Sequence, residues 1–320
     1  MRISLSEAII KLQNGEVVAI PTETVYGLAA DATNESALRQ IYAIKARPAD
    51  NPLIVHIGSY NQVLDWTNEF SPLAQKLANA FWPGPFTLVL PAKASVSNIL
   101  RAGEPTVALR VPNHPLALQL LQQSGLSLAA PSANKYTQLS PTSAAHVAIG
   151  LGDAVPVLDG GACKVGVEST IVSVHSDDWQ LLRHGMITEA QVANIAGKPA
   201  LRNIVNLALP KAPGQHMLHY SPRTPTLLFK DKITINSALE KFAKENITCA
   251  ALVIGKENIN NKENTIYLSN KPKAVAEALY DALHRLDALS ADRILVKMPP
   301  NNTEWATITD RLTRAGQFLV

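Results

Sequence analysis

The chain has 320 residues, of which 47% are apolar and 17% charged, so it can bury a large core and is expected to form two globular domains. This composition excludes a disordered protein. Charges are mixed into the first apolar residues, and no apolar run approaches the roughly 20 residues of a membrane helix, so we expect neither a signal peptide nor a membrane contact. The net charge of +3 is ordinary and decides nothing about partners.

The two cysteines, Cys163 and Cys249, are far apart and lack the spacing of zinc ligands. Such usage is typical of a reducing compartment, which predicts a cytoplasmic protein with two buried thiols.

Helix and strand signals alternate through the first two hundred residues. Ser4 and Glu7 form a capping-box pattern, Asn34 can cap a second helix, and Pro72 and Pro115 each stand where a first helical turn begins. The predicted strands of this part are 17–20, 53–57, 87–90, 107–111, 127–130, 155–158, 169–174 and 180–183. So many strands between helices indicate an α/β fold with a twisted mixed sheet.

Prolines and a glycine interrupt the pattern in residues 206–225, which we interpret as a linker between a domain at 1–205 and a second domain at 226–320. In the second domain the predicted strands are 225–229, 249–255, 265–269 and 292–299, and the predicted helices are 237–244, 272–289 and 303–315. This alternation predicts a smaller, doubly wound (Rossmann-like) α/β domain.

Two polar clusters lie where an α/β sheet places its ligands. Thr22, Glu23 and Thr24 directly follow a strand, where two hydroxyls and a carboxylate could orient a polar substrate or simply stabilise a turn. Lys45 and Arg47 are spaced to reach one anion, although an isolated basic pair is more often a solvated surface. His56, in the strand that follows, is by itself more typical of the core than of a site.

Arg110 stands inside an otherwise apolar strand, 107–111. A buried guanidinium needs a carboxylate or phosphate partner, so a structural ion pair and a ligand contact carry nearly equal weight. Ser132, Asn134 and Ser140 offer donors for phosphate oxygens.

The last polar cluster consists of residues 166–170 together with Arg183 on the next strand. Each of these clusters is a weak signal of a binding site when it is taken alone. The chain has no phosphate-binding glycine loop, no dinucleotide glycine turn, no paired metal motif and no nucleophile elbow. Scattered basic and hydroxyl side chains would therefore have to hold a nucleotide.

Five segments in this order, PTETVYGL, KARPADNPLIVHI, TVALRVP, APSAN and GVESTIV, resemble the YrdC-type family of L-threonylcarbamoyladenylate synthases. The linker and the additional C-terminal domain resemble the long two-domain form of that family. The resemblance covers roughly residues 1–205. It implies a nucleotidyltransferase that makes threonylcarbamoyl-AMP and pyrophosphate from L-threonine, bicarbonate or CO2, and ATP, with Mg²⁺ accompanying the ATP. It further implies transfer of the product to a tRNA threonylcarbamoyl transferase, a weak contact with tRNA, and modification of position 37 in ANN-decoding tRNAs to threonylcarbamoyladenosine.

The resemblance also assigns residues to ligands. The residues implied to bind L-threonine are Thr24, His56, Arg110, Ala130 and Ser169. The residues implied to bind ATP are Arg47, Asn51, Thr106, Ser132, Asn134, Ser140, Arg183 and Tyr220. Lys45 and Arg47 would offset the charge of the phosphates during the reaction, with no resident metal and no covalent intermediate.

The linker departs from the family pattern at Gln215, which follows Pro213-Gly214 where the family has methionine. Because the linker of this family can fold over the active site, the change concerns closure and not the catalytic set.

Two rival functions remain. An RNA-binding module could use the same basic residues, but it needs stacking aromatics, and aromatics make up 5% of the chain. A regulatory or carbamoyl-transferring relative could keep the fold and change the substrate.

Overall fold

A computed structural model describes residues 1–201, 220–255, 257–261 and 263–319. These residues fall into two compact units, one of residues 1–136 and 141–201 and one of residues 137–140 and 220–319, and each is described by itself. Most of the predicted linker, including Gln215, lies outside the described residues. The domain boundaries at 205 and 226 therefore stay a prediction.

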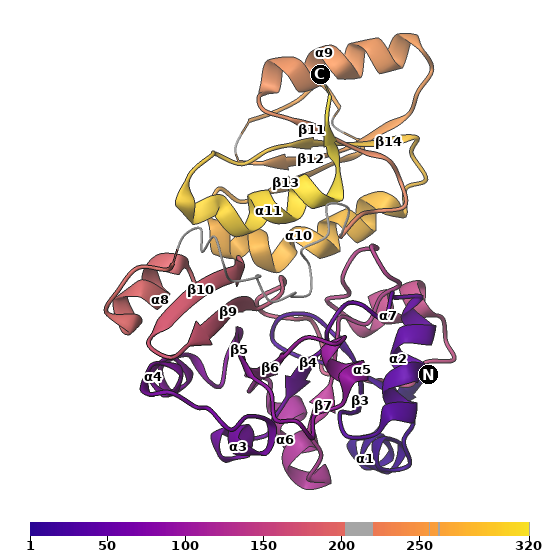
Figure 1. Cartoon of the computed structure of the whole chain (residues 1–320). Coiled ribbons are helices and arrows are strands. Elements are labelled where there is room, and N and C mark those ends of the chain that lie inside the picture. Colours follow the sequence, from indigo (N-terminus) through magenta and orange to yellow (C-terminus); the bar gives the residue numbers. More distant parts are fainter. Residues whose placement is uncertain (202–219, 256, 262, 320) are drawn as a thin grey trace. The chain divides into compact units, whose positions relative to one another are not determined.

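The first unit is built on a ten-stranded mixed sheet with the strand order β1-β8-β2-β3-β7-β4-β6-β5-β9-β10 (Figure 1). Its strands are β1 (Arg2–Ile3), β2 (Val18–Ile20), β3 (Gly27–Asp31), β4 (Ile54–His56), β5 (Phe86–Pro91), β6 (Thr106–Arg110), β7 (Leu128–Ala129), β8 (Val157–Leu158), β9 (Thr170–His175) and β10 (Asp178–Arg183). Its helices are α1 (Leu5–Gln13), α2 (Glu35–Lys45), α3 (Val63–Trp66), α4 (Pro72–Phe81), α5 (Asn98–Arg101), α6 (Pro115–Ser124), α7 (Ala144–Leu151) and α8 (Glu189–Ala196), with a 3₁₀ turn η1 (Tyr60–Gln62). The mixed sheet confirms the predicted fold class.

Local sequence explains where these helices begin. Ser4 and Glu7 form a reciprocal capping box at α1, and the Asn34 side chain accepts hydrogen bonds from the first amides of α2. Pro72 and Pro115 occupy the first turns of α4 and α6, as their fixed φ favours. Helix α2 ends at Lys45, because Ala46 takes a left-handed conformation with φ of 50°.

Alternation along four central strands separates an apolar face from a polar one. On β6, Val107 and Leu109 join the main hydrophobic core, while Thr106, Ala108 and Arg110 have the opposite parity and face the other side. The same core receives Val55 of β4 together with residues of α2 and α4. The polar face is therefore the side of the sheet that is turned away from these helices.

The second unit has a five-stranded, all-parallel sheet with the order β13-β12-β14-β11-β15. Its strands are β11 (Thr226–Phe229), β12 (Cys249–Ile254), β13 (Thr265–Leu268), β14 (Arg293–Lys297) and β15 (Gln317–Phe318), and its helices are α9 (Lys232–Lys244), α10 (Pro272–Asp287) and α11 (Ala306–Ala315), preceded by the 3₁₀ turn η2 (Thr303–Trp305). Helix α9 covers one face of the sheet and α10 and α11 cover the other (Figure 1), which confirms the doubly wound prediction.

Helix α9 begins at Lys232, five residues before the predicted start at 237. The β-branched residues at its start reduce the helix signal, but the Asp231 carboxylate accepts from the Thr234 amide and caps the helix there.

Replacing Asn34 with Ala should lower the free energy of unfolding by about 1 kcal/mol, because the first amides of α2 lose their acceptor. The shift of the urea denaturation midpoint measures this. Asn34→Asp keeps the acceptor oxygen and should remain close to wild type, so an equal loss in that variant would exclude capping as the cause.

Candidate functional site

The polar face of the central strands carries most of the predicted site. Its floor is a small apolar cluster that includes Ile54, Val89, Ala108 and Ile171. Thr106 and Arg110 lie on this face at the two ends of β6, four residues and thus about 13 Å apart. A ligand on this face can therefore meet different polar groups at its two ends.

Arg110 is the centre of the first group. It is 3% exposed, and its guanidinium donates from Nε to Gly84 O (3.1 Å), from Nη1 to Thr24 Oγ1 (3.0 Å) and from Nη2 to Glu23 Oε1 (2.6 Å). The last contact is a buried ion pair. The structural ion pair that the sequence left open is therefore present, and it includes the threonine of the PTETVYGL segment as well.

His56 lies beside Arg110, because β4 and β6 pair in parallel with these two residues in register. Burial, and to a lesser extent the charge of Arg110, lowers the pKa of His56 to about 3. The imidazole is therefore neutral at physiological pH and can take part in hydrogen bonds without adding charge.

Ser169 and Arg183 form a second group with Thr87. Arg183 donates from Nε to Ser169 O and from Nη2 to Ser169 Oγ, both at 3.0 Å, and the hydroxyl oxygens of Ser169 and Thr87 lie 2.7 Å apart. The backbone joins the two groups, because Arg110 binds Gly84 O while the Thr170 amide binds the carbonyl of Pro85.

Lys45 fixes the APSAN segment. Its buried ammonium donates to Ser132 O at 2.5 Å and to Asn134 O at 2.6 Å. Burial is the main cause that holds the pKa of Lys45 well below its ordinary value, with Arg47 and Lys135 adding to the effect. Ser132 in turn bridges to Gly27 on the strand that follows Thr24, so this group adjoins the first.

Arg47, Asn51 and Thr106 mark the opposite end of the face. Arg47 is buried, and its Nη2 donates to Pro52 O at 3.1 Å, directly before β4. The Asn51 carbonyl accepts from the hydroxyl of Tyr42 at 3.0 Å. Since β4 and β6 are parallel, the residues before β4 lie at the same end of the sheet as Thr106.

Three other predicted site residues remain. One contributes only its backbone, and the other two belong to the second unit. Ala130 contributes backbone, with its amide bound to Ile54 O at 3.1 Å. Ser140 and Tyr220 belong to the second unit, where the Ser140 carbonyl lies 3.2 Å from His284 Nε2 and the Tyr220 ring lies under the guanidinium of Arg311. These two residues are described in their own unit only.

From the sequence, the Glu23 carboxylate could orient a polar substrate, but Glu23 was not placed among the residues that bind threonine or ATP, and neither Thr87 nor Gly84 was singled out. The signal for Glu23 was available, because a buried arginine needs an acid and Glu23 lies in a motif that follows a strand. Thr87 and Gly84 carry no such signal, since only strand register brings them to the site.

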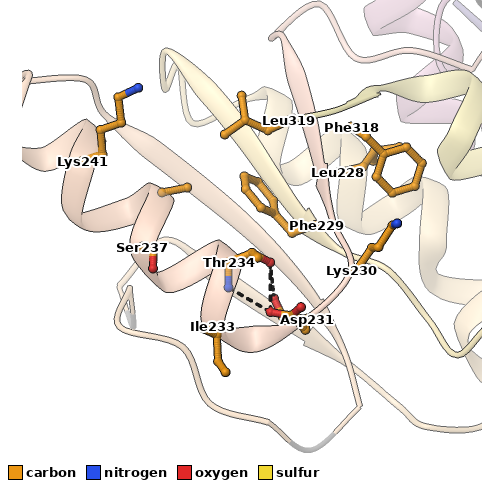
Figure 2. A pocket seen from close by; sticks show the side chains of 11 residues that line it. Leu228, Phe229, Lys230, Asp231, Ile233, Thr234, Ser237, Lys241, Phe318 and Leu319 are labelled. Atoms are coloured by element: carbon orange, nitrogen blue, oxygen red, sulfur yellow. Dashed lines mark hydrogen bonds between the residues drawn. The ribbon is translucent and has the colours of Figure 1, made fainter.

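The second unit holds a separate pocket of about 810 Å³ between β11, β15 and α9 (Figure 2). Leu228, Phe229, Phe318 and Leu319 line it, with Lys230 and Lys241 at opposite ends of the view. None of the predicted site residues lines it, so it is not the site that the motifs describe.

Two family models together match nearly the whole chain. The Sua5, YciO and YrdC family model, described as "Telomere recombination", matches residues 11–185, and the model described as "Threonylcarbamoyl-AMP synthase, C-terminal domain" matches residues 186–316. The chain belongs to this family. The match confirms the family that the five motifs predicted and the long two-domain form that the linker and the C-terminal domain predicted.

Similar proteins support this membership along their full length. Threonylcarbamoyl-AMP synthase of Bacillus subtilis (strain 168) is 37% identical, covering 98% of this chain and 92% of the relative. The enzyme of the same name from Pyrococcus abyssi (strain GE5 / Orsay) is 36% identical, covering 97% and 93%. The crystal structure of P. abyssi Sua5 complexed with L-threonine superposes with a TM-score of 0.88 at 32% identity, covering 99% and 98% of the two chains.

Among the described residues, no helix is long and apolar enough to cross a membrane. In the same residues, no three or more His, Cys, Asp or Glu side chains gather in a way that could hold a metal ion.

His56 should make stability depend on pH. Its pKa of about 3 in the fold lies below the ordinary 6.5, so the unfolded chain binds the proton more readily. The stability is fully present above pH 6.5 and is lost as the pH falls toward 3, by at most on the order of 5 kcal/mol. Urea denaturation across this range should show a shallower loss for His56→Gln than for wild type. If the stability of wild type and of His56→Gln fell equally with pH, the lowered pKa of His56 would be contradicted.

Proposed function

We propose that this protein is a threonylcarbamoyl-AMP synthase, which joins L-threonine, bicarbonate or CO2, and ATP into threonylcarbamoyl-AMP and pyrophosphate. The observation that carries the proposal is the way the buried cations of the first unit are held. Lys45, Arg47, Arg110 and Arg183 each donate to a backbone carbonyl. Such bonds hold the four basic side chains in fixed positions around one face of the sheet, an arrangement that favours anionic substrates.

The threonine subsite is assigned to the end of β6 that carries Arg110. Its predicted members are Thr24, His56, Arg110, Ala130 and Ser169. Hydrogen bonds, strand register and the Gly84–Pro85 backbone connect these residues within one unit. Arg110 keeps two N–H groups beyond its three described hydrogen bonds, which suits bidentate binding of the substrate carboxylate. The P. abyssi relative was crystallised with L-threonine, which supports the assignment.

The ATP subsite is assigned to the Thr106 end of the face together with two groups that adjoin the threonine subsite, the Ser132–Asn134 segment and Arg183. Its proposed members in the first unit are Arg47, Asn51, Thr106, Ser132, Asn134 and Arg183. The roles of Ser140 and Tyr220 toward ATP stay a prediction from the sequence. The hydroxyl, amide and guanidinium groups of this set are suited to phosphate and ribose oxygens.

The chemistry requires positioning and neutralised charge rather than a covalent nucleophile. The α-ammonium group of threonine releases a proton to solvent, and the resulting amine adds to CO2 with loss of a second proton to give a carbamate. The carbamate oxygen attacks the α-phosphorus while pyrophosphate leaves, so the enzyme acts as a nucleotidyltransferase. Arg47 would offset charge on the phosphates, and Lys45 would hold Ser132 and Asn134 in place while adding positive charge beneath them. We place Mg²⁺ on the phosphate oxygens of ATP, as is usual for this ion.

The product would pass to a tRNA threonylcarbamoyl transferase that modifies position 37 of ANN-decoding tRNAs, with at most a weak contact between this protein and tRNA. The two free cysteines, of which Cys163 is buried, fit a cytoplasmic enzyme.

Pyrophosphate release from ATP tests the function directly. Release by the purified full-length protein should require both L-threonine and bicarbonate, because neither alone gives the attacking carbamate. Omission of each in turn should reduce the rate to background. Release that ignores both omissions would contradict the synthase function.

Substitutions at the two ends of β6 should weaken the binding of different substrates. Arg110→Lys keeps the charge beside Glu23 but loses the planar fork, so it should weaken L-threonine binding about 10- to 100-fold and leave ATP binding nearly unchanged. Thr106→Val keeps the shape of the side chain and should weaken ATP binding instead. Calorimetric titration of each ligand measures both, and equal losses for both ligands in either variant would contradict the division.

A further inference from the structure

Arg110 and Glu23 form a buried pair of opposite charges at the threonine end of the polar face. Arg110 Nη2 and Glu23 Oε1 are 2.6 Å apart, and the two side chains are 4% and 8% exposed. Taking both charges out of water is unfavourable, and replacing such a pair with apolar residues is often neutral or stabilising. Stability alone therefore does not account for a buried ion pair at this position.

The second oxygen of Glu23 is the informative atom. Oε2 is buried and has no hydrogen-bond partner within the described ranges. An unsatisfied buried acceptor costs about 1–3 kcal/mol, and more when it is charged. Such an atom in a ligand site indicates that a donor belongs to the bound state.

The groups nearest to Glu23 cannot supply that donor as a cation. Burial raises the pKa of the Cys163 thiol to about 12, and burial lowers the pKa of His114, so both side chains are neutral at physiological pH. Arg110 already uses Oε1. Lys164, the nearby cation, is exposed and has no described contact with Oε2, so the position is open to a cationic group of the substrate.

We propose that Glu23 Oε2 accepts a hydrogen bond from the α-ammonium group of the bound amino acid, while the remaining N–H groups of Arg110 bind its carboxylate. The negative charge of Glu23 then meets the ammonium group of the zwitterionic substrate, and the positive charge of Arg110 meets its carboxylate. Glu23 thereby selects substrates with a free α-ammonium group and places the nitrogen that becomes the carbamate nitrogen. This inference rests on the proposed threonine subsite and adds a specificity-determining residue to it.

The segment that contains Glu23 also holds the ion pair in place. Thr24 Oγ1 accepts from Arg110 Nη1 and lies 2.8 Å from Thr22 Oγ1, while the Val165 amide binds the Glu23 carbonyl at 2.7 Å. Guanidinium and carboxylate are thus both held by the PTETVYGL segment, which leaves them little freedom to turn away from a ligand.

The test compares two ligands in two proteins by calorimetric titration. The ligands are L-threonine and its 2-hydroxy analogue, in which a hydroxyl replaces the α-ammonium group. Wild type should bind threonine at least about 10-fold more tightly than the analogue, because a charge-assisted hydrogen bond is lost. Glu23→Gln should weaken threonine binding about 10- to 100-fold and change binding of the analogue by less than about 3-fold.

The comparison separates the proposal from a purely structural role of Glu23. If Glu23 only positions Arg110, Glu23→Gln weakens threonine and the analogue by the same factor, because both ligands keep the carboxylate. That result would overturn the proposal. Glu69→Gln, the same change at an exposed glutamate of the same unit, is the matched control and should change neither affinity.

If Glu23→Gln does not fold, the two titrations of the wild-type protein still test the proposal. Equal binding of threonine and the analogue by wild type would refute the ammonium contact without any variant. Failure of wild type to bind threonine at all would instead refute the proposed function, so the two failures are distinguishable.

Discussion

The alternation of side chains along four neighbouring strands is the constraint on which the site depends. In β4, β5, β6 and β9 every second residue enters the main core, so the residues between them reach the opposite face. The register places His56 beside Arg110 and sets Ala108 against both Ile54 and Val89. A slip of one residue would bury the polar groups in the core, so the same packing that stabilises the sheet also fixes the site.

The buried basic side chains favour anionic ligands on this face. The four buried cations are anchored to carbonyls of the loops and strand ends around the face, and these loops are in turn held by backbone hydrogen bonds such as Tyr136 N to Lys45 O. The result is a preorganised positive surface, in which little reorganisation is needed when phosphates or a carboxylate arrive. Glu23 places a negative charge within this surface, where it pairs with Arg110.

Much of this arrangement could be predicted from the sequence. The caps at Ser4 and Asn34 are local signals, and the apolar stretch around Arg110 correctly predicted a buried strand with a paired arginine. Strand β3 was not predicted, because its sequence GLAAD has low strand propensity and only its neighbours hold it in the sheet. The ligand assignments stay predictions. They rest on motif order, while the contacts of Lys45 and Glu23 depend on long-range pairings that no local pattern encodes.

The central claim is that one face of the sheet offers two separate but adjoining subsites, with threonine around Arg110 and ATP between the neighbouring Ser132 and Arg183 groups and Thr106. The most direct measurement is calorimetric titration of L-threonine into the full-length protein, with and without a saturating nonhydrolysable ATP analogue. Separate subsites predict a ternary complex, with threonine affinity unchanged or increased by the analogue. Mutually exclusive binding of the two ligands would contradict the account.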